Sequence, residues 1–205
     1  AIQKIEYELK RLFPMAGITR IDRDLVKNYD QLQDSLDAFN QGADILIGTQ
    51  MISKGHNFPN LGLVGMIGMD TMLNFPDYRA TERLFQLMTQ TAGRAGRDID
   101  NSQVMIQTFN ANHYVFNYVK DHDVDSFLNH EMASRKVLNY PPFRSIVNII
   151  FSAQKQSLVE SLYPKIQSFN QTLSDLSVQP IGPKVAPIEK ASGYYRHNVF
   201  YKGDN

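Results

Sequence analysis

The chain has 205 residues, of which 42% are hydrophobic, and its 21 basic residues balance its 21 acidic ones. This length allows one or two domains with a buried core, and a net charge of zero argues against a generic binder of polyanions. With no cysteine, the chain has no disulfide and no thiolate metal site. Because no apolar run approaches the ~20 residues of a membrane span, we expect no membrane segment.

Helices and strands alternate in the predicted first part of the chain. Apolar residues at helical spacing predict helices, and short apolar runs without alternation predict buried strands. In chain order, we expect a helix from residue 2 to Pro14, a strand at 18–21, a helix around Leu36 that ends at Gly42, strands at 44–49 and 61–69, a helix near 79–92 and a strand at 102–109. This alternation implies an α/β fold with a mostly parallel sheet and flanking helices.

The second part of the chain follows a different pattern. We expect helices at 115–119 and 124–138, a break at Pro141 and Pro142, a strand at 145–152, one helix at 157–176, and strands at 178–185 and 194–201. These elements predict a small α+β domain. We therefore divide the chain into residues 1–138, an α/β domain with two trailing helices, and residues 139–205, a C-terminal domain that we expect to be truncated at Asn205.

Charge is distributed unevenly between these two parts. Residues 1–138 hold 14 basic and 17 acidic residues, a net charge of −3, whereas residues 139–205 hold 7 and 4, a net charge of +3. The basic part also ends on an aromatic-rich segment with Lys190, Tyr195 and Arg196. Aromatic rings stack on bases and basic side chains contact phosphates, so this segment is a candidate DNA surface. An ordinary strand with one buried face fits the same alternation.

Two arginines near residue 95 give the strongest chemical signal. Arg94 and Arg97 each follow a glycine and lie three residues apart, so a helical segment would project both from one face. A guanidinium group is a rigid fork that matches phosphate oxygens, which suits stabilisation of a transferring phosphoryl group. A single Gly-Arg pair would favour solvated arginines on a turn. The repeated pair, with Gln90 before it, resembles motif VI of superfamily 2 helicases.

A polar loop follows the predicted strand at 44–49. Open α/β sheets bind their ligands at the carboxyl ends of such strands. Thr49 offers a hydroxyl group, Lys54 a charge, and Gly55 allows close approach to the backbone. Taken alone, the loop also fits an ordinary connection with a helix cap. Its place about 40 residues before the arginine pair resembles the order of helicase motifs V and VI.

Longer segments extend this resemblance. The segments GTQMISKGHNFPNL, DYRATERLFQL, QTAGRAGR and GPKVAPIEKASGYYR together are similar to the PriA, or primosomal protein N′, family of replication-restart DNA helicases in superfamily 2. The resemblance covers the whole chain and implies a RecA-like second helicase lobe followed by the family's C-terminal domain. It implies the C-terminal part of an ATP-dependent 3′→5′ DNA helicase that restarts stalled forks and loads the primosome. A non-catalytic DNA- or protein-docking module and another superfamily 2 translocase are the alternatives.

Roles for single residues follow from the same resemblance. Arg94 and Arg97 would be the catalytic residues. The residues assigned to ATP binding are Gly55, Asn57, Gln90, Arg94 and Arg97, and those assigned to DNA binding are Thr49, Gln50, Lys54, Lys190, Tyr195 and Arg196. Asn57 stands where many helicases carry aspartate. The segment with Asp77, Arg79 and Glu82 resembles a family motif and equally fits an acidic helix N-terminus.

Cofactors and partners are implied rather than visible in the residues. The chain lacks the G-x-x-x-x-G-K-[ST] phosphate cradle and the acidic pair that holds magnesium in such enzymes. We therefore expect the isolated chain to hydrolyse no ATP, with ATP and Mg²⁺ bound mainly by a first lobe outside it. Zinc is implied only in a cysteine-rich segment, also outside this chain. The implied partners are branched and single-stranded DNA, single-stranded DNA-binding protein and primosome loading proteins, in the bacterial cytoplasm at the nucleoid, with no membrane.

Overall fold

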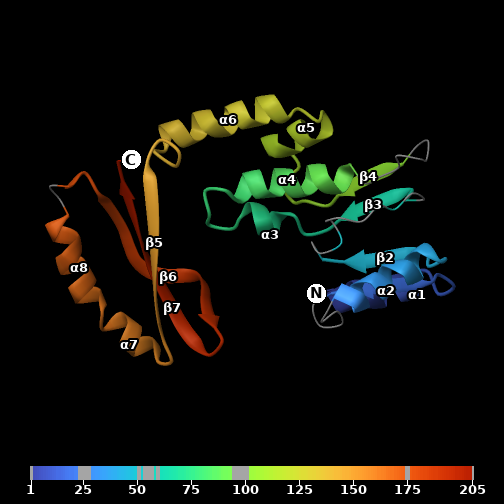
Figure 1. The fold of residues 1–205 in the computed structure, drawn as a ribbon, viewed down its shortest axis with the longest axis horizontal. Coiled ribbons are helices and arrows are strands. Elements are labelled where there is room, and N and C mark those ends of the chain that lie inside the picture. The colour runs from blue at the N-terminus through green and yellow to red at the C-terminus, as the bar shows by residue number, and fades with distance from the viewer. Residues whose placement is uncertain are drawn as a thin grey trace. The chain divides into compact units, whose positions relative to one another are not determined.

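The computed structural model describes residues 2–22, 29–49, 52, 58, 61–93, 102–173 and 176–204. The chain forms two compact units (Figure 1). The first comprises Ala1–Met72 and Arg83–His113, and the second comprises Leu73–Glu82 and Tyr114–Asn205. Residues 114–138, which we expected to trail the first domain, group with the second unit. A domain boundary at residue 138 stays a prediction.

The elements up to residue 106 follow the predicted alternation. They are α1 (Ile2–Leu12), β1 (Ile18–Ile21), α2 (Tyr29–Asn40), β2 (Ile45–Gly48), β3 (Leu63–Met66), α3 (Asp70–Leu73), α4 (Ala80–Ala92) and β4 (Gln103–Ile106). The short helix α3 is an addition to the predicted set. β2, β3 and β4 are each shorter than the strands predicted at 44–49, 61–69 and 102–109. For β3, the apolar run continues into the connections at both ends of the strand.

Both strand pairs of the first unit are parallel, as the alternation predicted. β1 pairs with β2, from Ile18 opposite Ile45 to Ile21 opposite Gly48, and β3 pairs with β4 in the same sense. Among the described residues, these pairs form two separate two-stranded sheets. The α/β class is therefore confirmed, with parallel strands and helices packed beside them (Figure 1).

A small core joins β1, α2 and the connection after β2. Ile21, Leu36 and Phe58 are buried together, and the rings of Phe39 and Phe58 meet edge-on with centroids 5.6 Å apart. Leu36 and Phe39 belong to the apolar stripe that predicted α2. The face of α2 that its sequence makes apolar is thus the face that packs.

The second unit has its own elements. They are α5 (Tyr114–Lys120), α6 (Val124–Val137), β5 (Ser145–Ala153), α7 (Gln156–Glu160), α8 (Tyr163–Thr172), β6 (Gln179–Ala191) and β7 (Tyr194–Gly203). α6 begins after Asp123, whose side chain accepts a hydrogen bond from the Ser126 N–H at 3.0 Å. Hydrogen bonds from the side chain and the backbone N–H of Ser126 lower the pKa of the Asp123 carboxyl. The cap explains why α6 begins at Val124, where the sequence predicted it.

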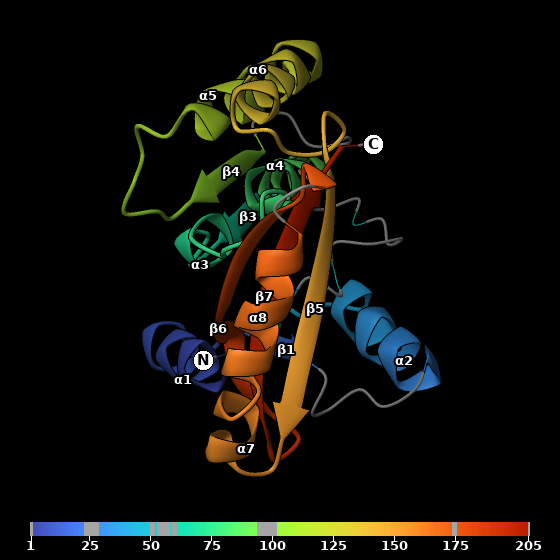
Figure 2. The same cartoon turned by 90° about the vertical axis from the view of Figure 1, so that its left-hand side faces the viewer.

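An antiparallel sheet with the order β5–β7–β6 forms the rest of the second unit. α7 and α8 cover one of its faces (Figure 2). On this face, Tyr163 Oη lies 2.6 Å from His197 Nδ1, and Tyr201 Oη donates to Asn170 at 2.9 Å. Successive residues of a strand point to opposite faces, so the even-numbered residues of β7 lie on the other face, away from α7 and α8.

Two predictions for this part were wrong in extent. The single helix predicted at 157–176 is interrupted at Ser161 and Leu162, giving α7 and α8. Pro164 lies in the first turn of α8, where its missing N–H costs nothing, whereas in a helix interior it would break a hydrogen bond. β6 continues to Ala191, well past the predicted end at residue 185.

No helix among the described residues combines the length and the apolar character that crossing a membrane requires.

Candidate functional site

The segment predicted as motif V begins at the carboxyl end of β2. Gly48 is the last residue of β2, and a Cβ atom there would lie 2.7 Å from the Ile52 side chain, so glycine is needed for this close packing. Ile52 in turn packs against the core that contains Phe58. The residues of the K-G-H segment are therefore bracketed in sequence by two anchored apolar side chains.

Only part of the predicted motif V site lies within the described residues. Thr49 is exposed directly after β2, and its carbonyl oxygen accepts a hydrogen bond from the Ile52 N–H at 3.2 Å. This is the edge of the strand where we expected ligand contacts. The other predicted residues of this segment lie outside the described residues, and their contacts stay predictions: Gln50, Lys54, Gly55 and Asn57.

α4 leads into the segment predicted as motif VI. Its inner face is apolar and buried through Leu84, Phe85 and Met88. Gln90, near the end of α4, is exposed, so its amide is free of the packing that holds the helix. Arg94 and Arg97 lie outside the described residues. Whether they share one helix face therefore stays a prediction.

The segment before α4 belongs to the second unit and is held by Asp77. The Arg79 guanidinium donates from Nε and Nη2 to the two carboxylate oxygens of Asp77 at 3.1 and 3.0 Å, and the Arg79 N–H donates to the same carboxylate at 2.9 Å. This fork-to-fork pairing with Asp77 raises the pKa of Arg79. Of the two interpretations of this segment, the helix-start role has direct support, since Asp77 organises the backbone just before α4.

Tyr78 connects this segment to α6 and Tyr140. Its ring stacks on the Tyr140 ring with centroids 5.5 Å apart, and the Arg135 guanidinium lies over it at 5.1 Å. Arg135 Nη2 also donates to Glu82 at 2.6 Å and lies 3.8 Å from the buried Glu131 carboxylate. Arg135 thus contacts two carboxylates and the Tyr78 ring, and these contacts hold the segment before α4 against α6.

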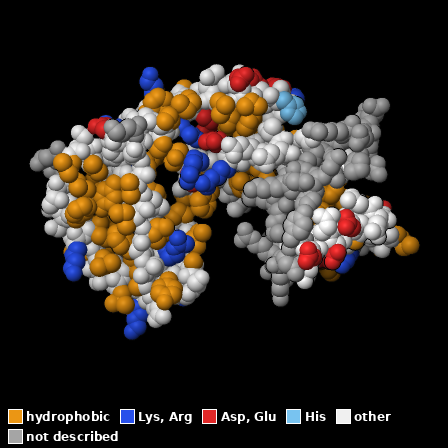
Figure 3. All heavy atoms as spheres, in the orientation of Figure 1, with side chains coloured by type: hydrophobic (Ala, Val, Ile, Leu, Met, Phe, Trp, Pro, Cys, Tyr) orange, Lys and Arg blue, Asp and Glu red, His pale blue; other side chains and the backbone are white. Residues whose placement is uncertain are grey.

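A groove of about 640 Å³ lies in the second unit. It is lined by residues 75–79, Tyr140 and side chains of β5, β6 and β7. The β7 residues that line it are the even-numbered ones, from Arg196 to Lys202, on the face that α7 and α8 leave open. Figure 3 shows basic side chains lying among hydrophobic ones over this sheet.

The three predicted DNA-binding residues of β6 and β7 divide between two places. Arg196 lines the groove. Lys190 and Tyr195 are opposite each other in the β6–β7 ladder, and the Lys190 ammonium lies 4.5 Å from the Tyr195 ring centroid. Because Tyr195 and Arg196 are neighbours on one strand, their side chains point to opposite faces of the sheet. Contact of all three residues with DNA stays a prediction.

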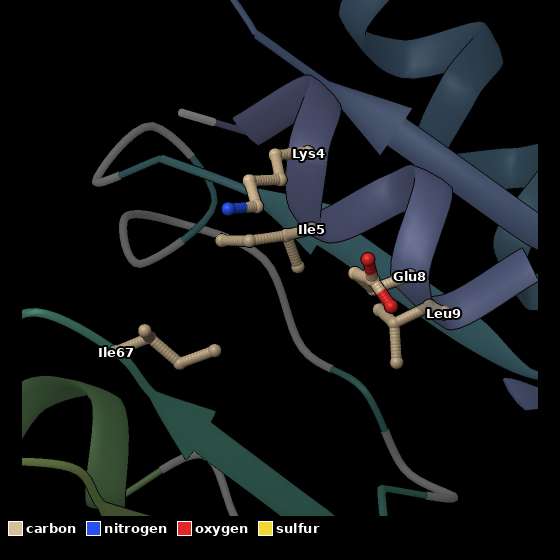
Figure 4. A pocket seen from close by; sticks show the side chains of 5 residues that line it. All are labelled: Lys4, Ile5, Glu8, Leu9 and Ile67. Atoms are coloured by element: carbon tan, nitrogen blue, oxygen red, sulfur yellow. The ribbon is translucent and has the colours of Figure 1, made fainter. Parts of the chain in front are cut away.

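A second depression, of about 480 Å³, lies in the first unit (Figure 4). Lys4, Ile5, Glu8 and Leu9 of α1 line it, with Ile67 after β3 facing them. Its surface is almost wholly aliphatic, and it lacks the converging polar groups that orient a ligand. The described residues also contain no cluster of histidine, aspartate or glutamate able to hold a metal ion. The groove of the second unit is therefore the better candidate site.

Comparison with known proteins supports the helicase resemblance. A helicase conserved C-terminal domain matches residues 3–98, a range that includes both predicted motifs. The chain is 38% identical to the replication restart protein PriA of Bacillus subtilis over 201 residues, which is 98% of the chain and 25% of that protein. The chain belongs to the PriA family.

Other PriA proteins match to the same extent. The identity is 39% over 202 residues with PriA of Borreliella burgdorferi, covering 98% of the chain and 30% of that protein. It is 38% over 204 residues with PriA of Rickettsia felis, covering 99% and 31%. The chain thus spans between a quarter and a third of the length of these PriA proteins, and it carries their C-terminal helicase domain.

Proposed function

We propose that this chain is the part of an ATP-dependent 3′→5′ DNA helicase that supplies motifs V and VI and a DNA-binding surface during replication restart. The observation that carries the proposal is the match of residues 3–98 to a helicase domain, together with similarity to replication restart proteins along nearly the whole chain. Arg94 and Arg97 are the catalytic residues in this proposal.

The structure of β2 and α4 supports the positions proposed for the motif residues at their ends. Thr49 and Gln90 are both exposed, at the ends of β2 and α4, while the apolar residues beside them are buried. The buried apolar residues therefore hold β2 and α4 in place, and the Thr49 and Gln90 side chains stay accessible to a ligand. Gln90, Arg94 and Arg97 would face the nucleotide, and Thr49, Gln50 and Lys54 would face DNA or a second lobe.

The nucleotide and its metal complete the proposal. Gly55 and Asn57 would lie near the ribose of ATP, and the two arginines would stabilise the charge of the transferring phosphoryl group. Mg²⁺ and most phosphate contacts are assigned to a lobe outside this chain, and zinc to a cysteine-rich segment also outside it. The proposed partners are branched and single-stranded DNA, single-stranded DNA-binding protein and primosome loaders, in the cytoplasm at the nucleoid.

Nucleotide hydrolysis tests this proposal directly. In the complete protein, DNA-stimulated ATP hydrolysis should be present, and it should be lost on Arg94→Ala or Arg97→Ala. The 205-residue chain alone should hydrolyse no ATP. Steady turnover by a clean preparation of this chain, abolished by Arg97→Ala, would contradict the assignment of the phosphate cradle to another lobe.

A further inference from the structure

The helix α4 belongs to both units. Residues 80–82 group with the second unit, and the rest of the helix groups with the first. The last turn of α4 carries Gln90, and the chain then enters the segment with Arg94 and Arg97. Because a continuous α-helix turns as one body, a rotation of its first turn moves the residues that follow its last turn.

Apolar packing alone does not fix the rotation of α4. The buried side chains of its inner face are Leu84, Phe85 and Met88. Apolar attraction has no preferred direction, so these contacts resist separation of the helix more strongly than a small rotation about its axis. Directional contacts are needed to set the rotation, and the structure provides them at the first turn of α4.

The first turn of α4 makes polar contacts with α5 and α6, which lie beside it (Figure 1). Glu82 accepts a hydrogen bond from Arg135 Nη2 of α6 at 2.6 Å, and Thr81 hydrogen-bonds the hydroxyl group of Tyr114 in α5. Tyr114 donates to Glu131 at 2.5 Å, and the Glu131 carboxylate lies 3.8 Å from Arg135. These five side chains form a closed polar ring through α4, α5 and α6.

The polar ring is shielded from water. Glu131 is 6% exposed, and the side chain of Arg135 is 14% exposed. Burial, and then the hydrogen bond to Glu131, raises the pKa of Tyr114, so its hydroxyl group stays a donor at neutral pH. Replacing a buried ion pair by apolar side chains of similar size is often neutral for stability. Stability alone therefore does not account for this ring, whereas the geometry that it fixes does.

Arg135 contacts the chain on both sides of the helix start. Its guanidinium lies 5.1 Å from the ring centroid of Tyr78, before α4, and it binds Glu82 inside the first turn. Tyr78 is held in turn by its stack on Tyr140. Two contacts four residues apart define the direction in which the helix starts, which a single contact would not do.

We propose that Arg135 is a positioning residue for ATP hydrolysis: it sets the rotation of α4 and thereby the place of Arg94 and Arg97 at the phosphoryl group. It acts through α4 rather than on the nucleotide. The two arginines stabilise charge that develops in the transition state, so a rotated α4 lowers kcat and leaves the KM for ATP nearly unchanged. The inference rests on the proposed function, because it concerns the same arginines.

Three variants of the complete protein test this role. Arg135→Lys keeps a positive charge beside Glu131 but loses the planar group over Tyr78. Glu82→Gln keeps the shape of the side chain and removes its charge, and it serves alone if Arg135→Lys does not fold. The control, Val159→Ala, leaves a cavity at a fully buried position of α7 and so destabilises the second unit without touching α4.

The kcat and KM of DNA-stimulated ATP hydrolysis are measured well below the lowest melting temperature, so that every variant is folded. Arg135→Lys should lower kcat by about 10- to 100-fold, the scale of a small misplacement of catalytic groups, with KM changed by less than about twofold. Glu82→Gln should act in the same direction. The double variant should lose no more than Arg135→Lys alone, because both changes break one contact. Val159→Ala should keep its kcat.

Three results would overturn the positioning role. One is an equal kcat for Arg135→Lys and Val159→Ala, and another is a raised KM at constant kcat. The third is a double variant whose loss equals the product of the two single losses. The control for the proposed function is Arg97→Ala: if that variant keeps normal turnover, the proposed function itself fails. If Arg97→Ala is inactive while Arg135→Lys is normal, only the positioning role fails.

Discussion

The two units use their polar residues in different ways. In the first unit, the motif residues within the described chain, Thr49 and Gln90, are exposed, and buried apolar side chains hold the elements that carry them. In the second unit, polar residues such as Glu131, Asn198 and Lys202 are themselves buried. The comparison predicts that motif substitutions in the first unit change activity at constant stability, whereas polar substitutions in the second unit change stability as well.

The largest effect is expected from the motif VI arginines. Arg97→Ala in the complete protein should lower ATP turnover by about 10³–10⁵-fold, because it removes a preorganised charge at the phosphoryl group. The melting temperature should stay unchanged, and Arg97→Lys should rescue little, since an ammonium group cannot form the planar fork. Near-normal turnover by the lysine variant would argue against this role. A lowered melting temperature would contradict the expectation that motif substitutions in the first unit leave stability unchanged.

The next effect concerns the second unit. Arg135→Ala should lower the free energy of unfolding by about 3 kcal/mol, because it removes the cation that pairs with Glu82 and lies 3.8 Å from the buried Glu131 carboxylate. The neighbouring Lys136 is exposed on the same helix and gives a matched control. Denaturant unfolding of both variants measures the difference. Similar losses for Arg135→Ala and Lys136→Ala would show that the network contributes nothing specific.

Substitutions at two glycines measure separately the cost of backbone strain and the cost of lost close packing. Both Gly182 and Gly193 have a positive φ, but a Cβ atom at Gly182 would lie 3.0 Å from the Asn198 carbonyl oxygen, whereas Gly193 has open space. Gly193→Ala should therefore cost about 1 kcal/mol of strain, and Gly182→Ala about 2–3 kcal/mol. Equal melting temperatures for the two variants would show that β7 moves away without cost.

A smaller, pH-dependent effect is expected in the first unit. Asp70 accepts hydrogen bonds from the Thr108 hydroxyl group at 2.8 Å and from the Phe109 N–H at 3.1 Å, and the bond from Thr108 in particular lowers the pKa of its carboxyl. A lowered folded-state pKa means that this stabilisation is present above the unfolded value, near pH 4, and is lost as pH falls through the folded value.

Asp70→Asn should flatten the acid side of the stability curve, measured as melting temperature between neutral and acidic pH. The exposed Asp34 of α2 provides the control, because Asp34→Asn changes the same charge without touching Thr108. If Asp70→Asn left the acid dependence of stability unchanged, these hydrogen bonds would not favour the charged carboxylate.

The helices and strands were largely predictable where the spacing of apolar residues is the dominant sequence pattern. The apolar stripe of α2 appears in the sequence and sets the observed helix. The start of α6 at Val124 was also predicted, although its Asp123 cap was not identified from the sequence. Prediction failed where prolines compete with the pattern. Pro164 breaks the long helix, while Pro187 does not end β6, because an edge strand tolerates a residue without an N–H.

The candidate site was predicted only in part. Arg196 was assigned to DNA binding from local charge and aromatic content, and it lines the groove. Lys202 and Asn198 were missed, since nothing local to either residue shows that it would be buried on the same sheet face as Arg196. Tyr78 and Arg79 reach the groove only because a segment more than 100 residues earlier packs into the same unit. Sequence spacing carries no signal for such an arrangement.

The strand order of the second unit also affects how the protein is made. β7, the last strand to be synthesised among β5, β6 and β7, occupies the centre of the sheet and pairs with both others. On the ribosome, β5 and β6 therefore emerge with no partner between them, and the sheet assembles only when β7 arrives. A stop codon before Tyr194 would remove the middle of this sheet rather than its edge, leaving two strands exposed to aggregation.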